Sequence, residues 1–229
     1  MDARILKVGG LDITVERAAE HVRRYFDEAG SRKAASAVKG RPFAYPAYDR
    51  MVTGSGPDEL NDGDLLAPLL LNAGPTIAAV YSLQAVRPTL EAGLAAIPPD
   101  LTLRSAVREG RGAHRTLIEG LFGVLDAPGG VRGVGLTTLT KVLHRKRPLF
   151  LPLFDRRVKA CYYGSGDKWP LRPVSGRTKA EFFARLAECM VDDLDSRPDE
   201  WAAVAKEAPA DVPLLRVLDV VAWTRGTSA

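Results

Sequence analysis

Apolar side chains recur every three or four positions through most of this sequence, which is the spacing of one face of an α-helix. Residues 14–30 and 114–125 show this pattern most clearly. A half-buried strand would instead alternate apolar and polar residues. The apolar run at 149–154 is interrupted by Pro152, which favours an extended link over a strand. The sequence therefore predicts an all-α fold, built as a helical bundle.

Glycine and proline residues set the expected helix limits in the first half of the chain. Gly30 is expected to stop the first helix, and Pro88 is expected to open a short new one. A further helix, or a broken pair of helices, covers residues 64–86 with an interruption at 74–75. These limits predict several short helices in this half.

Polar residues set the expected helix starts in the second half. Thr178 and Glu181 have the spacing of a capping box, and Asp211 is expected to cap the last helix. Trp223, near the end of that helix, is interpreted as a core residue because an aromatic side chain at helical spacing usually packs inward.

We expect one mostly helical domain over residues 1–229. Hydrophobic residues make up 46% and charged residues 26% of the chain, as is ordinary for a globular protein. An arrangement of the helices in two lobes around a cleft is left open. The segment 31–63 has no steady period, and an irregular connection of this length in a compact domain usually serves a function.

Several classes of protein and site are disfavoured. No apolar run approaches the roughly 18 residues that span a bilayer, and the N-terminus lacks the apolar region of a signal peptide. Cys161 and Cys189 form no CxxC pair, and His21, His114 and His144 are scattered along the chain. We therefore expect a cytoplasmic protein with reduced thiols, no membrane contact and no cofactor.

Positive charge is concentrated in the segment 141–159, whereas the segment 192–200 is acidic. The net charge of +4 is modest, so its distribution matters more than its total. A basic stripe fits contact with a polyanion such as the DNA backbone, and long cationic side chains on a solvated loop are the alternative. The stripe consists of Lys141, Arg145, Lys146, Arg147, Arg156, Arg157 and Lys159, with Asp155 as the single acid among them.

A glycine turn precedes this stripe. In "GVRGVGLTTLTKVL", Gly133 and Gly135 give backbone freedom between two expected helices. The N–H groups at the start of the second helix, with the hydroxyls of Thr137 and Thr138, suit a phosphate. We predict DNA contacts from these residues and from Val134, with a plain turn between packed helices as the alternative.

The stretch "VRGVGLTTLTKVL…LPLFDRRVKACYYG" resembles the core of the helix-hairpin-helix DNA glycosylases. That family has a hydrophobic-x-Gly-Val-Gly hairpin, a helix, an extended segment containing proline, and Asp-x-x-Val at the start of the next helix. Twenty positions separate Gly135 from Asp155, close to the family's interval, and Val158 also matches. The resemblance covers residues 117–164 and places a helix-hairpin-helix core at about 114–164.

The whole chain is also similar to an uncharacterised family of high-GC bacteria. The runs "HRKRP" and "LRVLDVVAW" carry that similarity. It supports the limits of the domain and implies no chemistry.

The glycosylase resemblance implies that Asp155 is the catalytic carboxylate of an enzyme that removes a base from DNA. Such a carboxylate stabilises the cation-like sugar or activates a water. Thr137 stands where bifunctional members carry a Schiff-base lysine, and Lys141 is not assigned that role. The implied enzyme is therefore monofunctional, and it also lacks the cysteines of the iron–sulfur branch. By the same resemblance, the carbonyls of Val131 and Val134 would hold a monovalent cation.

Base excision also requires a pocket for the base that is flipped out of the duplex. Tyr25, Phe43, Tyr45 and Tyr48 are candidate walls, chosen by conjecture. Two other functions stay open, namely a non-catalytic nucleic-acid-binding module and a helical protein-interaction domain. Asp155 also has an alternative role, because an aspartate before "RRVKACYY" is a good helix cap without any catalysis.

Overall fold

The structure is a computed structural model that describes residues 4–110 and 112–226. Most of these residues are helical, so the predicted all-α fold class is confirmed. The strands are β1 (Ile5–Val8) and β2 (Leu11–Thr14). The α-helices are α1 (Val15–Phe26), α2 (Glu28–Ala35), α3 (Asp62–Leu66), α4 (Ile77–Ala95), α5 (Leu103–Arg108), α6 (Ala113–Phe122), α7 (Leu136–Leu143), α8 (Arg156–Tyr162), α9 (Lys179–Ser196), α10 (Pro198–Ala205) and α11 (Leu214–Arg225). The 3-10 helices are η1 (Ala67–Leu71), η2 (Gly123–Leu125) and η3 (His144–Lys146).

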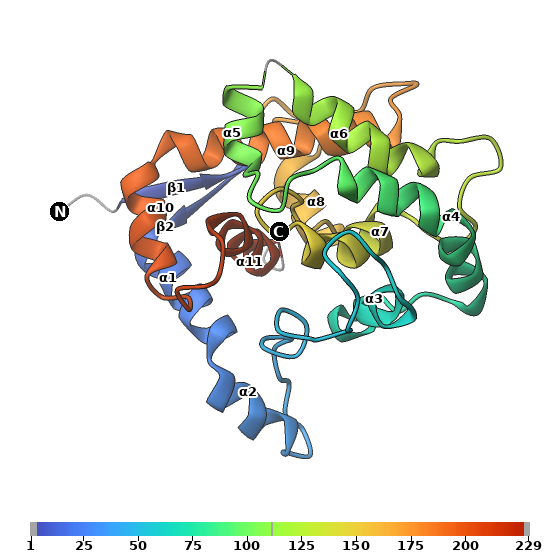
Figure 1. Cartoon of the computed structure of the whole chain (residues 1–229). Helices are drawn as coiled ribbons and strands as arrows, with labels where there is room; N and C mark the ends of the chain where they lie inside the picture. The colour runs from blue at the N-terminus through green and yellow to red at the C-terminus, as the bar shows by residue number, and fades with distance from the viewer. Residues whose placement is uncertain (1–3, 111, 227–229) are drawn as a thin grey trace.

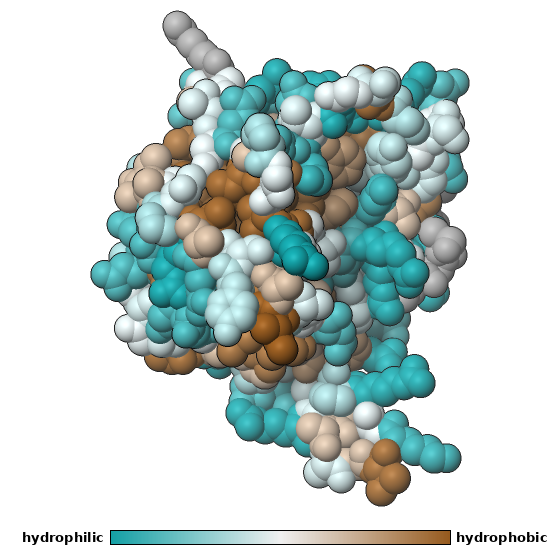
Figure 2. Space-filling view, turned by 90° about the vertical axis from the view of Figure 1, so that its right-hand side faces the viewer, coloured by the Kyte–Doolittle hydropathy of each residue, from teal (hydrophilic) through white to brown (hydrophobic). Residues whose placement is uncertain are grey.

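The helices surround α11, which packs against α1 on one side and α8 on the other (Figure 1). The long helix α9 runs across one side of the molecule, with α5 and α6 packed against it (Figure 1). Helix α2 projects from the body of the protein, as Figures 1 and 2 both show. Segments from both ends of the chain therefore meet around α11.

A small β-hairpin precedes the first helix, and the sequence analysis missed it. Strands β1 and β2 pair antiparallel, with Ile5 opposite Thr14 and Val8 opposite Leu11. Gly9 has a φ of +61° in the turn, and a Cβ there would lie 2.2 Å from the carbonyl oxygen of Cys161. Only glycine therefore allows the hairpin to pack so closely on α8.

Three predicted helix limits were wrong. Gly30 does not end the first helix, because α1 ends at Phe26 and Asp27 then caps α2 by accepting from the Gly30 N–H at 2.9 Å. Pro88 lies inside α4 and opens no new helix. Asp211 does not cap α11, which begins after Pro213 without a side-chain cap.

Other local predictions are confirmed. The interruption at 74–75 separates η1 from α4, and the extended link at 149–154 forms no strand. Thr178 and Glu181 form the predicted capping box of α9, where Glu181 accepts from the Thr178 N–H at 2.9 Å. Each of these features depends on residues that are close in sequence.

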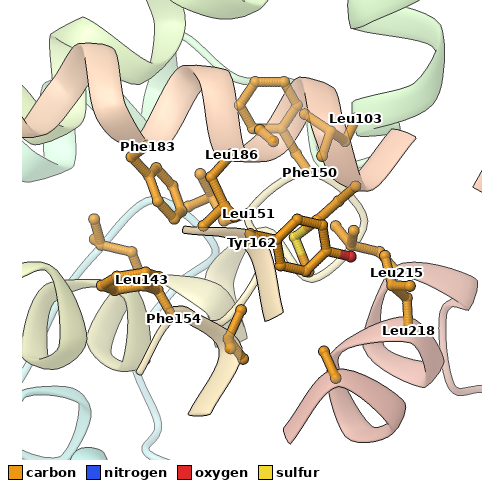
Figure 3. Packing of buried hydrophobic residues seen from close by; sticks show 14 of the residues in the cluster. Leu103, Leu143, Phe150, Leu151, Phe154, Tyr162, Phe183, Leu186, Leu215 and Leu218 are labelled. Carbon is orange, nitrogen blue, oxygen red and sulfur yellow. The ribbon is translucent and has the colours of Figure 1, made fainter. Parts of the chain in front are cut away.

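Most of the core is one large hydrophobic cluster, and a small second cluster contains Tyr48, Ala67 and Leu153. Figure 3 shows part of the large cluster. Tyr162 of α8, Phe183 of α9 and Leu218 of α11 converge there with the extended segment 150–154, which is buried throughout (Figure 3). Burying side chains from segments so far apart in sequence holds α8 and the residue before it, Asp155, in a fixed position.

Asp193 gives the core a pH-dependent contribution to stability. Its buried Oδ2 accepts from the Gly9 N–H and the Tyr162 hydroxyl, both at 2.7 Å. Burial raises the pKa of Asp193 from 3.8 to about 6. Between about pH 4 and pH 6 the folded state keeps the proton of Asp193, whereas the unfolded state has lost it. The contribution of Asp193 to the free energy of unfolding therefore falls as the pH rises through this range.

We expect the Asp193→Asn variant to lack that slope, since an amide does not titrate in this range. Chemical denaturation at several pH values measures it, as the difference in free energy of unfolding between parent and variant. The advantage of the parent should shrink as the pH rises through this window. A difference that stays constant would show that Asp193 titrates normally in the folded protein.

Candidate functional site

A cavity of about 700 Å³ opens between α1, η1, α7, α8 and α11. Aromatic, cationic and carboxylate side chains share its wall, which is the composition of a site for a polar organic ligand. The residues that line it are Arg24, Tyr25, Arg41, Pro42, Phe43, Ala44, Ala47, Leu70, Leu71, Asn72, Lys141, Leu153, Phe154, Asp155, Arg157, Arg216, Asp219, Val220 and Trp223.

Asp155 is both the cap of α8 and part of the cavity wall. Its Oδ1 accepts from the backbone N–H of Arg157 at 2.8 Å and of Val158 at 3.0 Å, so the helix-cap interpretation is confirmed. Its Oδ2 lies 3.9 Å from the Nζ of Lys141. The cap fixes the carboxyl group through one oxygen only, which leaves the second oxygen on the side of Lys141 and the cavity.

Lys141 lies inside the protein, which corrects its placement in an exposed stripe. Its side chain is 6% exposed, and its Nζ donates to the carbonyl oxygen of Leu71 at 3.1 Å. Burial lowers the pKa of Lys141, and the nearby Asp155 works against that shift. Lys141 is therefore a buried residue of the cavity wall.

A buried ionic network lies beside Lys141 and Asp155, and it was not predicted from the sequence. The Nε of Arg216 donates to Asp49 at 2.7 Å, its Nη2 donates to the Tyr25 hydroxyl at 2.6 Å, and its Nη1 bonds to Asp219. Burial raises the pKa of Asp219 to about 7, and the Arg216 charge opposes this rise. A buried carboxyl group with a raised pKa therefore lines the cavity.

Aromatic rings form one wall. The ring centroids of Tyr25 and Phe43 are 5.3 Å apart, and that of Trp223 lies 6.2 Å and 6.4 Å from them. Trp223 is half-buried and faces the cavity, so its interpretation as a core residue was wrong. Tyr45 and Tyr48 are buried outside the cavity lining, the latter donating its hydroxyl to the Lys141 carbonyl at 2.8 Å. Two of the four suggested wall residues are therefore in place.

The centre of the predicted basic stripe is also mostly buried, and the assignment of Arg145, Lys146 and Arg147 to DNA contacts stays a prediction. Lys146 donates to the Ser55 hydroxyl at 2.6 Å and lies 3.2 Å from Asp64, which Arg145 also approaches at 3.4 Å. Arg147 is 1% exposed. These three side chains bind the polar groups of the irregular segment before α3, whose backbone needs partners once it is covered.

The glycine turn lies where it was predicted, between η2 and α7. Gly133 has a φ of +75°, and the Val134 N–H donates to the Val131 carbonyl at 3.0 Å. Thr137 and Thr138 are half-buried at the start of α7. The turn does not line the cavity. Helix α7 connects the turn to the cavity, because α7 begins beside the turn and carries the cavity residue Lys141 near its end. The roles of this turn in phosphate and cation binding stay predictions.

Neither a metal-ligand cluster nor a bilayer-spanning helix occurs in residues 4–110 and 112–226. No group of three or more His, Cys, Asp or Glu side chains there is placed to hold a metal ion. Cys161 and Cys189 are both free thiols. None of the helices in these ranges combines the length and apolar character that crossing a bilayer would require.

Comparison with known proteins identifies a family and no characterised relative. The model of a family of unknown function (DUF6308) matches residues 18–226, and the chain therefore belongs to this family. Searches of curated proteins and of solved structures give no significant match. The family match covers every segment that lines the cavity.

Proposed function

We propose that this DUF6308 member binds DNA and removes a base by hydrolysing its N-glycosidic bond, with Asp155 as the reacting carboxylate. One observation carries the proposal: Asp155 is fixed by the N-terminus of α8 through Oδ1, while its side chain lines a large cavity with an aromatic wall. The resemblance of residues 117–164 to helix-hairpin-helix glycosylases supports the same assignment.

The chemistry requires a negative charge beside the sugar. The bond between C1′ and the base nitrogen breaks, and its electron pair leaves with the base, so positive charge develops on the sugar. The ionised Asp155 stabilises this charge and accepts a proton from the water whose oxygen adds to C1′. The departing base takes up a proton from solvent, and the Asp155 proton returns to solvent.

The cavity also meets the steric requirement of the reaction. A base inside a duplex is out of reach, so the target nucleotide must turn out of the stack into a pocket. Tyr25, Phe43 and Trp223 form an aromatic wall against which a flat base packs. We propose that the turn at Gly133, with Thr137 and Thr138 and the exposed Arg156, contacts the backbone of the surrounding duplex.

The test is incubation of the protein with DNA duplexes that carry a panel of damaged or mismatched bases, followed by alkali, which cleaves the strand at abasic sites. We expect strand cleavage with at least one lesion, and only after alkali, because Thr137 replaces the Schiff-base lysine of bifunctional enzymes. Duplexes without a lesion serve as the control. Binding without release from any lesion would instead indicate a non-catalytic nucleic-acid-binding module.

One observation favours a helical protein-interaction domain as the second candidate. Figure 2 shows a broad apolar area on the side of the molecule that carries α3 and α4. Leu69 of η1 and Ile77 and Tyr81 of α4 are exposed large apolar side chains. Exposed apolar patches often mark protein interfaces. Failure to bind any nucleic acid at low salt would favour this candidate.

A further inference from the structure

We propose that Arg24, Arg41 and Arg157 form a phosphate seat at the mouth of the cavity, which holds the backbone of the nucleotide whose base enters. This inference rests on the proposed function and specifies how the substrate binds. The three arginines come from α1, from the irregular segment after α2 and from α8, and all three line the cavity. They converge although they are distant in sequence.

Within residues 4–110 and 112–226, the positive charges of these three arginines are not neutralised by ion pairs. In the described parts of the chain, no carboxylate oxygen lies within 4.0 Å of a guanidinium nitrogen of these three arginines. The neighbouring Arg23, in contrast, pairs with Glu207 at 2.8 Å. Deeper in the cavity, Arg216 is neutralised by Asp49 and Asp219. The uncompensated positive charge of the cavity therefore lies at its mouth and suits an anion.

Aromatic rings of the cavity wall orient two of these arginines. The guanidinium of Arg157 lies over the Trp223 ring at 4.1 Å from its centroid, and that of Arg24 lies over Phe43 at 5.8 Å. A cation–π contact engages the face of the guanidinium and leaves its N–H groups at the edge free to donate. Such a planar fork matches two phosphate oxygens. The aromatic wall thus orients the arginines as well as offering a surface for a base.

The chemical groups of the cavity wall change in a definite order from its mouth to its interior. Arg24 and Arg41 are exposed and Arg157 is half-buried, whereas the side chains of Lys141 and Asp219 are only 6% and 4% exposed. The wall therefore runs from exposed cations, through aromatic rings, to buried hydrogen-bonding and ionisable groups. A nucleotide has the matching order of charged phosphate, sugar and flat, hydrogen-bonding base. A purely apolar or an uncharged ligand would leave the guanidinium groups of the arginines without an anionic partner.

The inference is tested by fluorescence anisotropy with a short, labelled, single-stranded oligonucleotide at several salt concentrations. We expect Arg24→Ala, Arg41→Ala and Arg157→Ala each to weaken binding about fivefold or more at low salt. Each should also lower the slope of log affinity against log salt by about 0.7, the value for one phosphate contact on a single strand. Arg104→Ala is the matched control, because Arg104 is an exposed arginine of α5 that pairs with Asp195 and lies outside the cavity.

Arg157→Lys is a second variant, which separates loss of the positive charge from a local rearrangement of Trp223. It keeps the charge, so it should restore most of the salt slope that Arg157→Ala loses. Thermal unfolding of every variant checks that the fold is retained. A salt slope in the lysine variant as low as that of the alanine variant would contradict a role for this charge in phosphate binding.

The outcomes separate this inference from the proposed function. If the parent binds the oligonucleotide and the three alanine variants match it in affinity and slope, the phosphate seat is wrong while DNA binding stands. If the parent and variants show the expected differences with a 5′-mononucleotide but none binds an oligonucleotide, single-stranded or duplex, the seat is supported and the proposed action on DNA is wrong. If the parent binds neither ligand, both proposals fail.

Discussion

Replacing Arg147 with methionine should lower the free energy of unfolding by about 2–3 kcal/mol, because buried carbonyl groups lose a charged hydrogen-bond donor. The Nε of Arg147 donates to the carbonyl of Ile97 at 2.6 Å, and its Nη2 donates to that of Leu94 at 2.6 Å and bonds to Asp58. Its Nη1 donates to the carbonyl of Pro57 at 2.9 Å. Methionine fills much of the space but donates none of these hydrogen bonds, so the buried carbonyl groups lose their charged donor.

Urea denaturation measures this effect as a lower midpoint with an unchanged dependence on denaturant concentration. Arg156→Met is the matched control, because Arg156 is an exposed residue of the same predicted stripe and should change stability little. Equal stability of Arg147→Met and the parent would contradict the network. It would also indicate that the Arg147 side chain is free for the predicted contact with DNA.

Replacing Asp155 with asparagine should slow base release by about 100-fold or more, since positioned acid–base groups contribute roughly that much to a rate. Asparagine caps helices about as well as aspartate, so the free energy of unfolding should change by less than about 1 kcal/mol. The variant therefore removes the charge and keeps the cap. Single-turnover release from the best substrate of the lesion panel measures the rate.

Asp155→Ala is the companion variant, because it removes both the charge and the two cap hydrogen bonds. It should lose base release as the asparagine variant does, and it should also lower stability by about 1 kcal/mol. An asparagine variant that releases base at the rate of the parent would show that Asp155 acts only as a cap.

Features that depend on local sequence could be predicted. The capping box at Thr178, the turn at Gly133 and the helix after it need only a few neighbouring residues to specify them. The hairpin β1–β2 was missed because each strand has four residues, too few to show an alternating pattern. Its strands pack on α1, α9 and α11 and its turn contacts α8, and sequence periodicity does not reveal these long-range contacts.

The basic stripe shows why charge alone did not predict exposure. Arg145 and Lys146 are held inside by Asp64, which is 1% exposed and distant from both in sequence. The sequence did indicate that the irregular segment before Asp64 was unusual for a compact domain. It did not indicate that the polar groups of this segment would be satisfied by the cations after α7.

The candidate site was predicted only in part for a related reason. Asp155, Tyr25 and Phe43 were proposed and do line one cavity, although the last two were conjecture. Arg216 and Asp219 were overlooked because periodicity assigns polar residues of a helix to its solvent face. Helix α11 is instead covered on nearly every side, so its polar residues are buried as well.

The central claim is that Asp155 stabilises positive charge on a sugar that is held in the cavity, and one binding measurement tests it without knowledge of the target base. Two duplexes are compared, one with a cationic pyrrolidine ring in place of the target nucleotide and one with a neutral tetrahydrofuran ring. Because mimics of a transition state bind at least about 100-fold more tightly than ground-state ligands, we expect the parent to prefer the cationic duplex by that factor. Asp155→Asn should lose the preference while still binding the neutral duplex. Equal affinity of the parent for the two duplexes would contradict the claim.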